Sequence, residues 1–213
     1  MRIRIFVIAL GAVAVALIFT FPLWQSLLQP GGEEVIAVAI PGMTASLQAS
    51  FESFLPEQQA AYLEVAKTSP EQAIALIQAA LRQPIHAPED MSGLPSMVGP
   101  VRVVRSQFQR LDPIRWAQGE LSVYEQADNT LIARFENFST SNAPDLRVLL
   151  AAPASPTTLE ALGPLDQTVD LGQLLGTTGN QNYDIPADVD LANFDSLVLY
   201  SPSLNLIMSY APL

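Results

Sequence analysis

From residue 101 to its end, the chain consists of short apolar segments separated by turn residues, and this pattern restricts the fold more than any other feature. Residues 119–124 alternate between apolar and polar side chains, and residues 130–135 follow directly after an Asp128-Asn129 turn. These two segments are therefore predicted to pair as a β-hairpin. Short strands at this spacing predict a mainly β fold, an antiparallel sandwich or barrel, over residues 101–213. The other predicted strands cover residues 101–104, 145–150, 169–171, 174–175, 196–201 and 204–210, with a proline-rich loop at 151–165.

An apolar run that begins at residue 5 predicts a membrane anchor. Arg2 and Arg4 precede the run, and a tryptophan follows it. About 20 apolar residues are enough to cross a bilayer, and tryptophan is enriched at the bilayer interface. We predict that residues 1–30 form one transmembrane anchor that contacts the lipid through residues 5–28. Because positive charge stays on the cytoplasmic side, the N-terminus is expected in the cytoplasm and the C-terminal domain in a periplasmic, lumenal or extracellular space.

A cleaved signal peptide is the alternative explanation for the apolar run. Cleavage requires a small-residue site soon after the run. The Ala-x-Ala sequence in this region is Ala37-Val38-Ala39, well beyond the apolar residues. The sequence therefore favours an uncleaved signal anchor.

Residues 31–83 carry helical signals. Thr44 is placed to cap a first helix, Pro56 to open a second, and Ser69 to cap a third that continues to residue 82. Apolar residues in this region recur mainly at helical spacing. We predict two or three short helices, a helical hairpin that packs on the following domain or on a partner.

Residues 84–100 are rich in proline and glycine and are predicted to be a linker. The chain's one histidine, His86, lies here with Met91 and Met97. Histidine and methionine can ligate haem or copper. In a proline-rich linker, however, solvated side chains are the expected state.

Composition removes several classes of function. The chain has no cysteine, so disulfides, thiolate catalysis and cysteine-ligated metals are excluded. The formal net charge of −11 disfavours nucleic acid as a partner. No Gly-x-Ser-x-Gly, phosphate-binding loop or dinucleotide fingerprint is present. We therefore predict no catalytic residues, a protein that is not an enzyme, and no cofactor.

Calcium is a weaker alternative. Asp184, Asp188, Asp190 and Asp195 form a carboxylate-rich stretch, and carboxylates are calcium ligands. The stretch lacks the spacing and the glycine of an EF-hand. No metal site is predicted.

The last hundred residues carry a series of motifs in a distinctive order. They occupy residues 119–124, 131–138, 141–150, 169–174, 179–186, 197–200 and 210–213. From about residue 114 to the C-terminus, this order resembles the DM-thirteen domain family. The anchor followed by short helices also resembles membrane-anchored bacterial members of that family.

The resemblance implies a β-sandwich-like domain related to DOMON domains, for which a part in electron transfer has been proposed. That proposal depends mainly on one family cysteine in the penultimate strand, and the matching residue here is Ser201. A serine hydroxyl forms no thiolate. A second departure is Ala143, where the family usually has glycine. If that position required a positive φ, alanine would be strained.

The resemblance marks a set of family motif positions as candidate site residues. The amides beside Tyr183 are expected to stitch a loop to the sheet, with the gripping of a polar ligand as the alternative. Asn142 and Asp145 are expected to hold a turn through side-chain bonds to the backbone. The positions are Asn142, Pro144, Asp145, Asn180, Gln181, Asn182, Tyr183 and Ser201.

The anchor, the amphipathic helices and the missing cysteine lead to one expectation for function. We expect a membrane-anchored, non-catalytic interaction module or accessory subunit that docks on another membrane protein. The alternative is an electron-transfer or haem-binding accessory protein, as proposed for the family. A sensor of calcium or of a polar ligand is a third possibility.

Overall fold

The computed structural model describes residues 40–88 and 101–213, which form one compact unit. The predicted anchor at residues 5–28 and the predicted linker residues Met91 and Met97 lie outside the described residues. Within the described ranges, no helix combines the length and the apolar character that a bilayer crossing requires.

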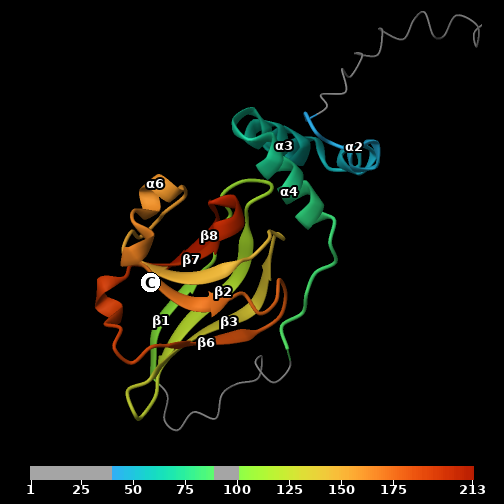
Figure 1. Ribbon diagram of the computed structural model, residues 1–213. Helices are drawn as coiled ribbons and strands as arrows, with labels where there is room; N and C mark the ends of the chain where they lie inside the picture. The colour runs from blue at the N-terminus through green and yellow to red at the C-terminus, as the bar shows by residue number, and fades with distance from the viewer. Residues whose placement is uncertain (1–39, 89–100) are drawn as a thin grey trace, which may run out of the picture. The chain divides into compact units, whose positions relative to one another are not determined.

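Two four-stranded antiparallel sheets form the body of the unit (Figure 1). The mainly β, antiparallel prediction is confirmed, whereas the barrel alternative is wrong because the described strands stay in two sheets rather than one closed sheet. The first sheet contains β1 (Val101–Gln107), β2 (Ala117–Glu125), β3 (Leu131–Thr140) and β6 (Gln181–Ile185), in the order β1-β2-β3-β6. The second contains β4 (Arg147–Ala151), β5 (Val169–Gln173), β7 (Ser196–Ser201) and β8 (Leu206–Pro212), in the order β5-β4-β7-β8.

The core lies between the two sheets. The predicted β2–β3 hairpin is confirmed, and its register places Leu121 opposite Phe135. Both side chains are fully buried in one apolar cluster with Val148 and Leu199 of the second sheet. Because alternate residues of a strand point to opposite faces, the alternation in the sequence directs one face of each sheet into this core. The aromatic part of the core includes Phe108, Phe138 and Tyr183 around Phe135.

Strand β7 is buried along its whole length because the outer face of its sheet is covered as well. Val198 and Ile207 pack there against Leu162. Leu162 belongs to a short helix, α6 (Leu159–Leu162), within the segment that was predicted to be a loop. The hydroxyl of Thr158 begins this helix by accepting a hydrogen bond from the amide of Ala161.

One strand is missing from the sequence prediction and one predicted strand is wrong. Polar side chains predominate in the β6 segment, and its apolar alternation is limited to Tyr183 and Ile185, which is too short to mark a strand. It becomes a strand by pairing with β3. Residues 174–175 form no strand, because they follow the end of β5 as a loop that bonds back to the backbone oxygen of Leu146.

Three helices confirm the start signals in residues 44–83. They are α2 (Ala45–Glu52), α3 (Pro56–Thr68) and α4 (Pro70–Ala80). The Thr44 hydroxyl accepts a hydrogen bond from the amide of Leu47, and the Ser69 hydroxyl accepts one from the amide of Gln72. These bonds satisfy amides that have no partner inside the helix.

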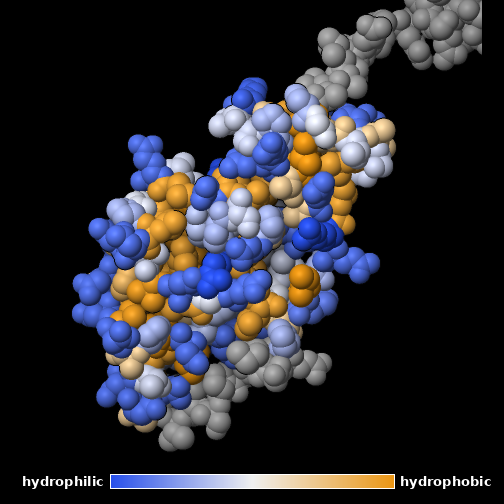
Figure 2. Space-filling view, in the orientation of Figure 1, coloured by the Kyte–Doolittle hydropathy of each residue, from blue (hydrophilic) through white to orange (hydrophobic). Residues whose placement is uncertain are grey.

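The helices pack on the sandwich and share its core. Leu76 and Ile77 of α4 are fully buried in the same apolar cluster as the sheets. The Gln72 side chain donates to the backbone oxygen of Leu204 at 2.7 Å. Figure 2 shows apolar side chains gathered over the helices and over part of the sandwich, with hydrophilic side chains covering most of the remaining face.

After α4, residues 84–88 of the predicted linker lie along the sandwich as a strap. The amide of Ala87 donates to the backbone oxygen of Thr178, and the amide of Thr178 donates to the backbone oxygen of Ile85. These strand-like bonds fix the segment to Thr178, which itself bridges to Ser139 of β3.

Candidate functional site

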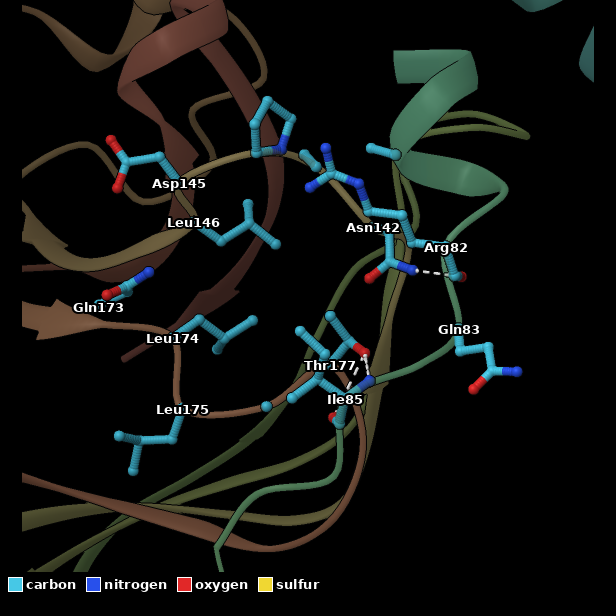
Figure 3. Close-up of a pocket in the computed structure, with 14 residues that line it drawn as sticks. Arg82, Gln83, Ile85, Asn142, Asp145, Leu146, Gln173, Leu174, Leu175 and Thr177 are labelled. Atoms are coloured by element: carbon cyan, nitrogen blue, oxygen red, sulfur yellow. Dashed lines mark hydrogen bonds between the residues drawn. The ribbon is translucent and has the colours of Figure 1, made fainter. Parts of the chain in front are cut away.

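A cavity of about 190 Å³ lies where the end of α4, the strap and the sandwich meet (Figure 3). We call it the motif cavity, because family motif residues form part of its wall. Three segments far apart in the sequence enclose it: residues 79–85, 142–146 and 173–177.

The 142–146 wall is a turn that ends at Asp145. Asp145 has a φ of 52°, a left-handed conformation that aspartate tolerates better than most residues. Ala143 is not among the positive-φ residues, so alanine is accommodated there without strain. The side chain of Asn142 donates to the backbone oxygen of Arg82 at 3.1 Å, so it ties the turn to the helices rather than closing the turn itself. The expectation for Asn142 therefore needs correction.

Ser201 lies behind this turn. Its side chain is fully buried, and its hydroxyl donates to the backbone oxygen of Pro144 at 2.6 Å. The bond joins the end of β7 to the cavity wall. The position that bears the family cysteine thus acts here as a structural tie.

Gln181 and Tyr183 support the opposite wall. The Gln181 side chain accepts from the amide of Gly176 at 3.2 Å and donates to its carbonyl oxygen at 3.0 Å. The Tyr183 hydroxyl donates to Gln181 at 2.7 Å and accepts from the amide of Leu175 at 3.0 Å. Burial raises the pKa of Tyr183, so this hydroxyl keeps its proton.

Gly176 is required by the strap. A Cβ atom at this position would lie 2.3 Å from the backbone nitrogen of Ala87. No side chain fits so close to a backbone atom. The glycine therefore lets the strap close one side of the motif cavity.

Asn180 and Asn182 stitch β6 to β3 and do not line the motif cavity. The Asn180 side chain accepts from the amide of Asn137, which has a φ of 50°. The Asn182 side chain accepts from Arg134 at 2.8 Å. These two bonds are of the kind that a stitching role predicts.

A second cavity, of about 390 Å³, adjoins the first and shares Arg82, Asn142 and Thr177 with it. We call it the aromatic cavity. Its lining combines aromatic rings with hydroxyl and amide groups. The lining residues are Phe54, Gln58, Tyr62, Ala80, Arg82, Pro84, Pro113, Ile114, Trp116, Ser139, Thr140, Ser141, Asn142, Thr177 and Thr178.

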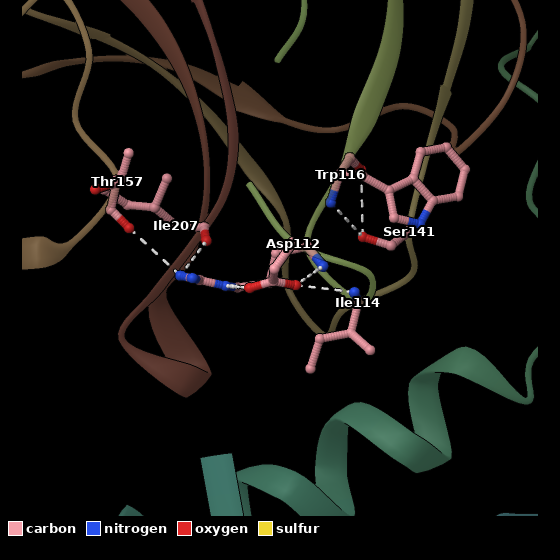
Figure 4. A network of polar contacts seen from close by, with 7 residues as sticks. Asp112, Ile114, Trp116, Ser141, Thr157 and Ile207 are labelled. Carbon is pink, nitrogen blue, oxygen red and sulfur yellow. Dashed lines mark hydrogen bonds and ion pairs between the residues drawn. The ribbon is translucent and has the colours of Figure 1, made fainter. Parts of the chain in front are cut away.

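A polar network holds the loop that brings Ile114 and Trp116 to this cavity (Figure 4). Asp112 accepts from the amide of Ile114 at 2.9 Å and pairs with the Arg115 side chain at 2.5 Å. The amide of Trp116 donates to the Ser141 hydroxyl at 3.3 Å. The loop is thus fixed both within itself and to β3.

Tyr62 brings a buried phenol to the aromatic cavity. Its ring packs between Phe51 and Phe54, with centroid distances of 6.3 and 5.5 Å. Burial, with a smaller effect from the charge of Asp112, raises the pKa of Tyr62 to about 12. The phenol therefore stays protonated at neutral pH.

No local sequence pattern predicts Arg82, Tyr62 or Trp116 as site residues. Arg82 ends a helical pattern, and Tyr62 follows the apolar spacing of one, so both suggest packing only. The closely spaced arginines that precede Trp116 in the sequence were the one available signal. They indicate local positive charge rather than a cavity.

Of the residues considered from the sequence as haem or copper ligands, His86 lies in the described part of the chain. His86 is exposed, and its Nδ1 atom lies 2.9 Å from the Thr178 hydroxyl oxygen. In residues 40–88 and 101–213, no three His, Cys, Asp or Glu side chains are grouped to hold a metal ion, and the aspartates from 184 to 195 are no exception.

Comparison with known families identifies the C-terminal part of the chain. The family model described as "Electron transfer DM13", the DM-thirteen domain, matches residues 107–213. No curated protein and no solved structure matches significantly. The matched range includes every family motif position and excludes α2–α4 and the strap.

Proposed function

Because this chain belongs to the electron-transfer DM13 family through residues 107–213, we propose that it is a membrane-anchored, non-catalytic accessory subunit of a complex related to electron transfer. The family description supports the relation to electron transfer. The apolar residues 5–28 support attachment to a bilayer. The domain is proposed to bind a membrane-protein partner rather than to carry electrons.

Ser201 is the observation on which the non-carrier role rests. A hydroxyl has no redox couple at biological potentials, and the Ser201 hydroxyl is already bonded to Pro144 in the buried interior. The position is therefore used to shape the 142–146 wall. Asn142 on that wall then joins the matched domain to the α4 end, which the family model does not cover.

Co-migration from the native membrane tests the accessory role. The full chain is extracted in mild detergent, separated under native conditions, and its companions are identified. We expect one defined complex that contains electron-transfer proteins. Migration as a free monomer would contradict the proposal.

The spectrum of the purified chain tests the alternative of haem binding or electron transfer by the chain itself. We expect no visible absorbance band before or after chemical reduction. A band that responds to reduction would show that the chain carries a redox group, and the non-carrier role would be wrong.

A further inference from the structure

Most of the positive charges in the described part of this acidic protein are neutralised locally. The chain has ten Lys and Arg residues against 21 Asp and Glu residues. Most basic side chains in the described ranges form an ion pair with a carboxylate. The paired residues are Lys67, Arg102, Arg105, Arg115, Arg134 and Arg147.

Arg82 and Arg110 are the exceptions among the described residues, since neither forms an ion pair. Both border the aromatic cavity. Arg82 lines it directly. Arg110 lies over the Trp116 ring, 5.4 Å from its centroid, and Trp116 lines the cavity. Figure 3 shows the Arg82 side chain extending along the edge of the neighbouring motif cavity.

One negative charge beside the aromatic cavity is already compensated. Asp112, whose charge affects Tyr62, is paired with Arg115 and accepts two backbone amides. Among the described residues, Arg82 therefore lines the aromatic cavity without a carboxylate partner, and the Asp112 carboxylate beside this cavity is occupied. An incoming anion would gain a charge-assisted hydrogen bond there.

The remaining wall suits an apolar ring. Phe54, Tyr62 and Trp116 supply aromatic surface. The Gln58 side chain uses its oxygen to accept from the amide of Leu55, so its NH₂ group remains a donor. The volume of about 390 Å³ falls in the range of small-molecule sites, about 300–1,000 Å³.

We propose that the aromatic cavity binds a small aromatic carboxylate, with the carboxylate at Arg82 and the ring against Phe54, Tyr62 and Trp116. A neutral ring would gain no charge-assisted hydrogen bond from the Arg82 guanidinium. A simple inorganic anion would leave the aromatic wall uncovered. The combination of one cation and an aromatic wall therefore selects a molecule that has both a negative charge and an aromatic ring.

This site does not depend on the proposed membrane complex. It uses side chains of one chain, so it is testable on the purified full chain without a partner. If the chain binds no aromatic carboxylate, the accessory role still stands, and if the chain is a free monomer, the site still stands.

Fluorine NMR of the full chain in detergent provides the test, with para-fluorobenzoate as the probe and para-fluorobenzamide as its neutral match. We expect saturable binding of the benzoate, displacement by unlabelled benzoate, and no displaceable binding of the amide. Arg82→Gln should weaken benzoate binding at least about tenfold, since it removes the charge-assisted bond. Arg102→Gln changes an exposed arginine on β1 and should leave the affinity unchanged.

Three results would overturn the proposal. The first is displaceable binding of the amide with equal affinity. The second is unchanged benzoate binding by an Arg82→Gln chain that keeps its melting temperature. The third is no displaceable benzoate binding at all, including the case in which only a peptide with a C-terminal aromatic residue binds.

Discussion

Ser201 shows at the scale of one residue how a change of a single atom alters what a position can do. Sulfur in its place would be a larger, weaker hydrogen-bond partner. Oxygen lies 2.6 Å from the Pro144 carbonyl and holds the turn that carries Asn142. The buried hydroxyl therefore contributes to stability rather than to redox chemistry.

Substituting Ser201→Cys should lower the free energy of unfolding by about 1 kcal/mol, because a buried hydrogen bond is weakened. The new thiol should react with a maleimide far more slowly than the thiol of Ser203→Cys, since Ser203 is exposed and Ser201 is fully buried. Urea denaturation and labelling rates measure the two effects. Equal labelling rates in the folded proteins would show that position 201 is accessible and would contradict the structural role.

Gly176 is a second residue whose role depends on a contact made in the folded protein. Its neighbour is a backbone atom of Ala87, which lies 89 residues earlier in the chain. The sequence around Gly176 resembles an ordinary turn. The requirement for glycine is therefore visible only once the strap is in place.

At the scale of elements, helix α4 depends on its first residues. Ser69 caps it, and Pro70 occupies a position where the missing N–H has no cost. The helix then buries Ala73, Leu76 and Ile77 against the sandwich. The end of α4 also places Arg82 beside both cavities, so the helix start affects the site.

Removing the cap with Ser69→Ala should destabilise the protein by about 1 kcal/mol, because the amide of Gln72 loses its partner. The matched control is Ser50→Ala in α2, whose hydroxyl only bonds back to the carbonyl of Ser46. This control should leave stability nearly unchanged. Thermal unfolding followed by circular dichroism compares the two variants with the unmodified protein. If Ser69→Ala melted at the same temperature as the unmodified protein, the cap would contribute nothing to stability.

Element starts were predictable, and the polar strand was not. Thr44, Pro56 and Ser69 signal helix starts through their own chemistry, and each signal is confirmed. The β6 segment has the polar side chains of a loop, and only its backbone bonds to β3 make it a strand. The energy that distant segments gain when they pair cannot be inferred from a local sequence pattern.

At the scale of the whole molecule, the helices and the sandwich are held by one shared core. Tyr62 belongs to this core, and its ring is 4% exposed. Ionising its phenol would place a charge among apolar side chains beside Asp112. The junction between helices and sandwich is therefore expected to be the alkali-sensitive part of the protein.

Stability should fall between about pH 10 and pH 12, because the pKa of Tyr62 is about 10 in the unfolded chain and about 12 in the folded protein. Below pH 10 the phenol is protonated in both states and has no effect. Above pH 10 the Tyr62 phenol loses its proton first in the unfolded state. The free energy of unfolding therefore falls by up to about 2–3 kcal/mol. Tyr183 shifts in the same direction and adds to the loss.

Urea denaturation across this pH range, with Tyr62→Phe as the comparison, measures the effect. The variant has no phenol to ionise at this position, so its stability should fall less steeply with pH. An identical pH dependence in both proteins would mean that Tyr62 ionises without penalty.

The sequence by itself determined the β pattern, the hairpin, the helix starts and the family, because each depends on local periodicity, turn chemistry or motif order. Only the tertiary structure decided which residues form the cavities. Arg82, Asn142, Gly176 and Ser201 come together from segments that no local pattern connects, since their contacts depend on how the layers pack. Among the residues that the structure describes, the same packing pairs six basic side chains with carboxylates and leaves Arg82 without such a partner.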